Sequence, residues 1–388
     1  MNRRRPHARH RLSRDAERLI WLARGLADSG SRQEDAYWET ELNGLIAKLL
    51  QADDDDALNL ALDRLNEATP PTRAYEELAD LIEAACEGSQ AGDTARLFIA
   101  LPVLAWSRYA IPTRAIPAAT LDALRAQLGA HVLADGARVH FADYLFSPDQ
   151  LPQGYAATRQ LAAELWQAAA AGRDLKVPAA HLPESQTFVS DVRYLLGVVQ
   201  APAGAPLFRW NEVDGSREQA LAAWREQGGA NLQKLLTGCA YELLLPDAYF
   251  AAWRHADQET RPFSLKAAVA YLHTLFGVPV SHLRAAAAPY YDRGLVEWRI
   301  GFSVHGSDQV VHGVTWPLLG QDDESTDIAG QIEAILKEAG MSEVTFLDTR
   351  MPLEYCDDCG APLFPSKEAE NVHAELPEDM QEAPAHLH

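Results

Sequence analysis

Cysteine is scarce in this chain, with four residues among 388. So few cysteines in a chain of this length do not make a disulfide framework, and they are typical of a reducing compartment. Long apolar segments are missing too. No apolar segment follows the basic start as it would in a signal peptide, and the longest apolar run, residues 97–106, is too short for a bilayer and contains Pro102. We therefore expect a cytoplasmic protein without membrane contact.

The common catalytic and nucleotide-binding motifs are absent as well. The sequence has no Gly-x-Gly-x-x-Gly after a strand, no Gly-Lys-Ser/Thr loop, no Gly-x-Ser-x-Gly elbow and no His-Glu-x-x-His helix. These absences remove the commonest nucleotide-binding, hydrolase and metalloprotease classes. An enzyme of another class stays open.

The net charge of −21 is distributed unevenly along the chain. Residues 1–13 are predicted to form a basic flexible arm, and the body that follows is acidic and would repel a nucleic-acid duplex. The arm is a candidate for a weak nucleic-acid contact; the alternatives are a solvated N-terminus or an arm that docks on the protein's own acidic surface. A basic protein partner would suit the acidic body. The arginines of the arm are Arg3, Arg4, Arg5, Arg9 and Arg11.

The spacing of apolar residues changes along the chain. Residues 14–90 show helical periodicity with capping signals, such as Ser31 followed by Glu34, and are predicted to form a helical region. Residues 91–186 and 187–350 are predicted to form two α/β halves. Residues 351–374 are expected to form a cysteine knuckle, and residues 375–388 an acidic disordered tail.

A weak internal repeat runs through the two α/β halves. Residues 124–128 followed by Asp143 resemble residues 232–236 followed by Asp247, and each aspartate is expected to cap the next helix. Strands near residues 97–106 and 192–199 should then hold related places in one sheet or in two similar sheets. The seam between the copies would be a natural ligand cleft.

A β-hairpin is predicted near residues 296–316. Apolar residues alternate on both sides of a turn at residues 306–308, which places His312 opposite Phe302. His312 is interpreted as a satisfied, half-buried histidine, and His305 as part of the turn near Asp308. Glu297 and Arg299 face the polar side and are interpreted as a paired surface charge.

The pair Cys356 and Cys359, followed by Gly360, is the local pattern that implies chemistry. Two thiolates at this spacing supply half of a structural zinc site. His373, with thirteen residues between it and Cys359, is the candidate third ligand. His386 and His388 could add a fourth, or a second chain could complete a four-cysteine site across a homodimer.

Two other interpretations of the cysteine pair remain open. A redox pair needs a lowered thiol pKa, whereas the neighbouring acids Glu354, Asp357 and Asp358 should raise it. An inert pair of thiols in a turn is the other alternative. The remaining cysteines, Cys86 and Cys239, lie among apolar core patterns and are poor ligand candidates.

The stretches at residues 11–19, 28–32 and 355–365 resemble an uncharacterised β-proteobacterial family, the domain of unknown function 2863. The likeness spans most of the chain and implies a cytoplasmic bacterial protein. It carries over no activity and no catalytic residue.

Taken together, the sequence predicts an α/β (α+β) protein. An N-terminal helical layer is followed by a mixed-sheet α/β region, with an internal duplication, and a C-terminal Cys-x-x-Cys knuckle closes it. The favoured function is a cytoplasmic, non-enzymatic binding or regulatory protein with a structural zinc. The alternative is an enzyme whose cleft gathers His305, Glu297 and Arg299.

Overall fold

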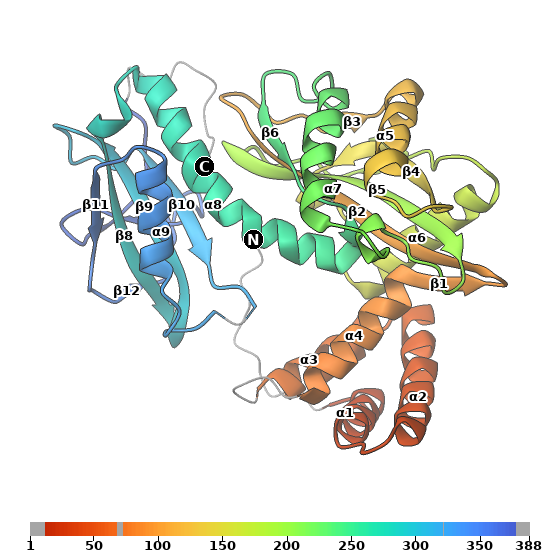
Figure 1. The fold of residues 1–388 in the computed structure, drawn as a ribbon. Helices are drawn as coiled ribbons and strands as arrows, with labels where there is room; N and C mark the ends of the chain where they lie inside the picture. The colour runs from red at the N-terminus through yellow and green to blue at the C-terminus, as the bar shows by residue number, and fades with distance from the viewer. Residues whose placement is uncertain (1–11, 68–72, 321, 378–388) are drawn as a thin grey trace.

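The computed structural model describes residues 12–67, 73–320 and 322–377. In these ranges it has two large β-sheets with helices packed on them, and a third sheet of two short strands (Figure 1). The predicted α+β class and the Cys-x-x-Cys segment near the C-terminus are confirmed. Most of the predicted arm (residues 1–11) and of the predicted tail (residues 378–388) lies outside the described residues. None of the helices in the described ranges is both long and apolar enough to cross a membrane.

An N-terminal layer of helices lies below the first sheet in Figure 1. Ser13 and Ser31 cap the first two helices by accepting hydrogen bonds from the amides of Ala16 and Glu34. Asp54 caps the third, so the acidic run at residues 53–56 serves as helix N-terminal charge. The helices are α1 (Arg14–Ala27), α2 (Arg32–Gln51), α3 (Asp55–Asn66) and α4 (Arg73–Glu87).

The first sheet is built around two long antiparallel strands, β2 and β5, which pair along their whole length. β4 and then β3 extend the sheet beyond β5, while β1, β6 and β7 all pair with the outer edge of β2. The strands are β1 (Gly88–Ala91), β2 (Thr94–Trp106), β3 (Arg114–Ala115), β4 (Arg138–Phe146), β5 (Ser190–Pro202), β6 (Ala240–Leu243) and β7 (Asp247–Ala248).

The order β6-β2-β5-β4, antiparallel throughout, is a split β-α-β, ferredoxin-like arrangement. The chain runs β2-α5-β4-α6 and then β5-α7-β6-α8, and each half places its second strand beside the first strand of the other half. Strand order and directions are therefore those that the predicted repeat requires. The helices are α5 (Ala118–His131), α6 (Tyr155–Ala170), α7 (Arg217–Ala223), continued by the π-helical turn η4 (Trp224–Gly228), and α8 (Tyr249–Phe276).

Two details of the predicted repeat are wrong. Residues 232–236 form turns, whereas residues 124–128 lie within α5, so the matched residues are not equivalent. Neither aspartate caps a helix: Asp143 accepts hydrogen bonds from Lys176 and Val177, and Asp247 accepts from Arg217 and from the amide of the adjacent Ala248. Both carboxylates bind residues that are distant in the sequence and that the tertiary fold brings close to them. A comparison of short sequence stretches does not reveal these partners.

Each face of the first sheet has its own apolar core. α5, α7 and η4 cover one face, where Trp224 is buried and donates to the carbonyl of Leu244. The N-terminal layer, α6 and the first half of α8 cover the other, around Tyr194 and Tyr249. The second half of α8 leaves this core and packs on the second sheet instead, so α8 joins the two sheets (Figure 1).

The second sheet has the order β10-β9-β8-β11, with β12 also pairing with β8. Residues 187–350 are thus divided between two sheets, which corrects the prediction of a single second half. The predicted hairpin is present, with His312 opposite Phe302. The elements are β8 (Leu283–Asp292), β9 (Gly294–Val304), β10 (His312–Pro317), α9 (Ile328–Glu338), β11 (Glu343–Phe346) and β12 (Met351–Pro352).

The two faces of the second sheet are covered differently. α8 and α9 pack on one face. The C-terminal segment, residues 353–375, crosses the other face and contains only the short strands β13 (Phe364–Pro365) and β14 (Asn371–Val372). Two glycines let it approach, because a Cβ on Gly313 would lie 2.4 Å from the Phe364 ring and one on Gly301 2.4 Å from the Pro365 carbonyl oxygen. We call residues 353–375 the cover segment.

Candidate metal centre

The two cysteines of the cover segment lie in a tight turn. The amide of Cys356 donates to the carbonyl of Ala361 and the amide of Gly360 donates back to the carbonyl of Cys356, both at 2.8 Å. Gly360 has a φ of +74°, which glycine adopts without strain. The turn therefore brings Sγ of both cysteines to the same side, as the sequence pattern predicts for a knuckle.

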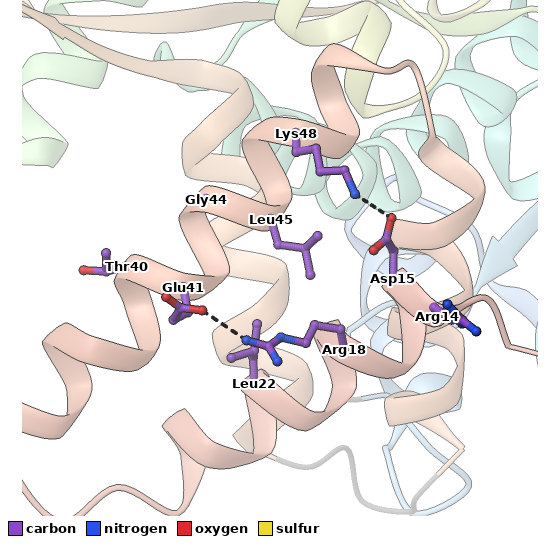
Figure 2. A pocket seen from close by; sticks show the side chains of 9 residues that line it. All are labelled: Arg14, Asp15, Arg18, Leu22, Thr40, Glu41, Gly44, Leu45 and Lys48. Carbon is purple, nitrogen blue, oxygen red and sulfur yellow. Dashed lines mark hydrogen bonds and ion pairs between the residues drawn. The ribbon is translucent and has the colours of Figure 1, made fainter.

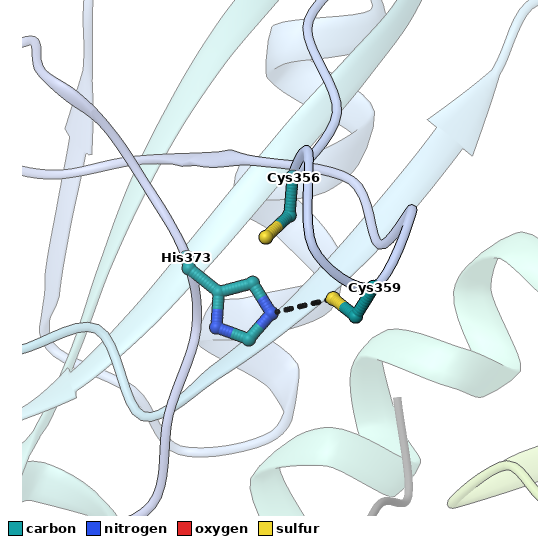
Figure 3. A group of neighbouring side chains, drawn as sticks. All are labelled: Cys356, Cys359 and His373. Atoms are coloured by element: carbon teal, nitrogen blue, oxygen red, sulfur yellow. Dashed lines mark hydrogen bonds between the residues drawn. The ribbon is translucent and has the colours of Figure 1, made fainter.

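His373 comes to this turn from the other side of the cover segment, directly after β14 (Figure 3). Its Nε2 lies 3.2 Å from Sγ of Cys359. One ligand atom from each of Cys356, Cys359 and His373 lies within 4.8 Å of the other two. The three residues are close enough to bind one metal ion, and they form the one such group of three or more in the described ranges.

The turn lowers the pKa of the Cys356 thiol. The backbone N–H of Cys359 and then that of Asp358 donate to its sulfur and lower its pKa below the usual value. The carboxylate of Asp358 acts in the opposite direction but is the weaker influence. Asp358 thus acts in the expected direction, but the net shift of the pKa is downward, since the turn directs amide dipoles at the sulfur.

Glu375 supports the histidine and was not anticipated from the sequence. Its Oε1 lies 3.0 Å from Nδ1 of His373. A carboxylate at Nδ1 holds the proton there and leaves Nε2 as the nitrogen that faces Sγ of Cys359, and a carboxylate in this place is the usual second contact of a metal-binding histidine. A Glu two residues after a candidate His is the sequence signal that would have indicated it.

Arg299 anchors the cover segment from the sheet below. Its side chain is fully buried, and its Nη1 donates to the carbonyls of Glu354 at 2.6 Å and Leu363 at 2.7 Å. The guanidinium also lies over the rings of Tyr290 and Tyr355. Both ends of the knuckle turn are therefore held by one buried cation.

Glu297 completes this anchor, which corrects the predicted surface charge pair. Its Oε1 accepts from Nε of Arg299 at 2.6 Å, and only 9% of Glu297 is exposed. The alternation of the strand correctly places both residues on the side opposite the apolar core. That side is buried because the cover segment packs on it. The alternation of a strand shows which face a residue lies on, but it does not show whether another segment packs on that face.

The other polar residues considered for a cleft lie elsewhere. His305 contacts Arg284 at 2.9 Å and Glu343 at 3.6 Å, and not Asp308 as predicted. Arg299 and Glu297 make their contacts beneath the cover segment instead. His305 therefore makes its contacts at one place on the second sheet, and Glu297 and Arg299 make theirs at another.

Cys86, Cys239 and His273 lie apart from the cluster. Cys86 is buried in the helical layer, where burial raises its pKa to about 12, and Cys239 is half-buried near Ser107. His273 binds the carbonyl of Val278 at the end of α8. His386 and His388 lie outside the described residues.

Comparison with known proteins gives one match. No curated protein and no solved structure matches the chain. A family model described as "Protein of unknown function (DUF2863)" matches residues 4–387, nearly the whole chain, and the protein therefore belongs to that family.

Proposed function

We propose that this chain is a non-enzymatic binding or regulatory protein in which a structural zinc ion fixes the cover segment. Cys356, Cys359 and His373 would be the protein ligands. The observation that carries the proposal is the ready-made ligand set, with all three donor atoms within 4.8 Å of one another. Thiolate and imidazole ligands on short turns favour zinc over calcium or magnesium, which prefer oxygen.

The surroundings of the cluster support a bound metal. Zinc binds the deprotonated thiolate, and the amides at Cys356 already stabilise that form. Glu375 orients the histidine with Nε2 toward the sulfurs. A tetrahedral site needs a fourth ligand, which we assign to water or to the segment that contains His386 and His388.

A structural metal would stabilise the cover segment on the second sheet. It has few backbone pairings of its own, since β13 and β14 contribute two residues each. A metal that ties the knuckle turn to His373 would close this segment into a loop and reduce the conformational entropy of its unfolded state. Together with the Arg299 anchor, it would fix the segment on the sheet.

The arrangement of the polar groups favours a binding protein over the enzyme alternative. An active site would bring His305, Glu297 and Arg299 into one cleft, whereas Glu297 and Arg299 are engaged with each other and with the cover segment. Their contacts hold the fold together. A surface rigidified by metal and a buried ion pair suits recognition of a partner.

Metal analysis of purified protein tests the proposal. We expect one zinc per chain, because the histidine and both cysteines come from the same chain, and less than about a tenth of that in Cys356→Ser/Cys359→Ser. Cys239→Ser is the matched control and should keep its zinc. Zinc-free protein of full thermal stability from zinc-rich cells would overturn the proposal.

A further inference from the structure

Three aromatic side chains form an exposed cluster where α1 and α2 meet. The ring of Trp38 contacts Trp21 and Tyr37 edge to face, at 5.1 Å between centroids in each case. Trp21 is 52% exposed and Tyr37 54% exposed. Half-exposed Trp and Tyr side chains in fixed positions are the residue types that dominate binding surfaces.

Packing on α1 holds the cluster in place. A Cβ on Gly25 would lie 2.7 Å from the Trp38 ring, so the indole lies directly on the helix backbone. Residues 32–41 of α2 include none that is buried, and the buried stripe of this helix begins at Leu42. The first turns of α2 thus present their aromatic rings to solvent, and the cluster does not serve as a core.

The stretch of α2 that carries Tyr37 and Trp38 is acidic. Residues 34–41 contain four acids (Glu34, Asp35, Glu39 and Glu41) and no lysine or arginine. One guanidinium already binds here: the Arg18 side chain lies 5.1 Å from the centre of the Trp21 ring and donates a hydrogen bond to Glu41. Aromatic faces beside carboxylates are the chemistry that receives arginine side chains.

A groove leads along α1 and α2 to this cluster. It encloses about 500 Å³ between the start of α1 at Arg14 and the Arg18–Glu41 pair (Figure 2). Its floor is open at Gly44, where an added Cβ would meet nothing within 4 Å. The ion pairs Lys48–Asp15 and Arg18–Glu41 line this groove. It reaches the aromatic cluster at Arg18, whose guanidinium lies over the Trp21 ring.

The segment that precedes α1 fits this path. Residues 1–11 lie outside the described part of the chain, join it at Leu12, and include five arginines (Arg3, Arg4, Arg5, Arg9 and Arg11). The distance along α1 from Arg14 to Trp21 is about 10 Å at the rise of an α-helix, whereas nine extended residues span roughly 30 Å. The length of the segment is therefore sufficient.

We propose that the arginine-rich segment, residues 3–11, docks on the Trp21–Trp38–Tyr37 cluster and its surrounding acids within the same chain. Charge and chemistry match, because guanidinium groups stack on aromatic rings and pair with carboxylates. The covalent connection gives the segment a high effective concentration at the cluster. A nucleic acid is the less suitable occupant of the cluster itself, since four carboxylates in residues 34–41 would repel its phosphates.

Limited trypsin digestion of the full chain tests this proposal. Docking hides the peptide bond after Arg9, so Trp21→Ala/Tyr37→Ala should be cut there about two- to fivefold faster than the natural chain, which is the loss expected for one exposed cation–π contact. Trp38 is left in place because it packs on Gly25. Tyr109→Ala is the matched control, since Tyr109 is an exposed aromatic of another region and should leave the rate unchanged.

Two further measurements test whether the carboxylates contribute to docking and whether the contact lies within one chain. Glu34→Gln/Glu41→Gln keeps the rings and should also accelerate cleavage, and added salt should do the same in the natural chain. The natural rate should not change with protein concentration, because the contact lies within one chain. Equal rates in all variants, or protection that appears only at high protein concentration, would overturn the proposal.

Discussion

The guanidinium of Arg299 donates a hydrogen bond of 2.6 Å to the carbonyl oxygen of Glu354, two residues before Cys356. A buried cation in the second sheet is thereby connected to the start of the knuckle turn. The stability of the sheet and the geometry of the candidate metal centre should therefore depend on each other.

Replacing Glu375 by glutamine should weaken zinc binding without abolishing it. The amide can still accept from Nδ1 of His373 but lacks the charge that strengthens the imidazole as a ligand, so affinity should fall about 10- to 100-fold. Competition with a chromophoric chelator measures the change. Glu370→Gln alters an exposed glutamate of the same segment and should bind zinc as the natural chain does; an equal loss there would contradict the role given to Glu375.

Replacing Arg299 by methionine should destabilise the protein strongly. It leaves the Glu297 carboxylate buried without its partner and removes both bonds to the cover segment, which should cost about 3–5 kcal/mol in the free energy of unfolding. Denaturant titration measures it, and Arg299→Met/Glu297→Met should recover much of the loss. Arg350→Met serves as control, since the Arg350 side chain is 72% exposed. Similar stability of Arg299→Met and the control would show that the anchor contributes little.

Replacing Gly313 by alanine should displace the cover segment. The new methyl group would lie 2.4 Å from the ring of Phe364, so the ring must move, at a cost of about 1–3 kcal/mol. Thermal unfolding and the rate of zinc loss to a chelator should both reveal it. Gly129→Ala adds the same methyl group to α5 in open space and should be neutral or stabilising by up to about 1 kcal/mol. Unchanged zinc release in Gly313→Ala would mean that the cover is not seated by this contact.

The pH dependence of stability should contain a contribution from Glu87 at the end of α4. Burial raises the pKa of this carboxyl from 4.5 to about 7, while the amide of Phe250, in the first turn of α8, donates to it. The folded chain then binds this proton more tightly than the unfolded chain does. Stability should therefore be lost as pH rises from 4.5 through about 7.

Glu87→Gln isolates this contribution. It keeps an acceptor for Phe250 and carries no charge, so it should be more stable than the natural chain at about pH 8, by roughly 1–2 kcal/mol for a half-buried group. At about pH 5 the two proteins should be nearly equal. Denaturant titration at both values measures the difference, with Glu39→Gln on the surface of α2 as control. A gain of equal size at both pH values would show that proton binding at Glu87 is not its source.

Much of the fold followed from local chemistry in the sequence. Helical spacing and the cap at Ser31 located the first helices because these signals act within one turn. Alternation fixed the hairpin register, including His312 opposite Phe302, because strand side chains have a strict period of two. The spacing of Cys356 and Cys359 and the turn at Gly360 indicated the knuckle for the same local reason.

Tertiary structure decided what depends on distant segments. It brought His373 and Glu375 to the knuckle, and it buried Glu297 and Arg299 by laying the cover segment over a strand face that alone would be solvated. It also placed β5 between β2 and β4, where the order along the chain suggests separate halves. Periodicity reports which side of a strand or helix a residue occupies, whereas burial and coordination depend on what packs against that side.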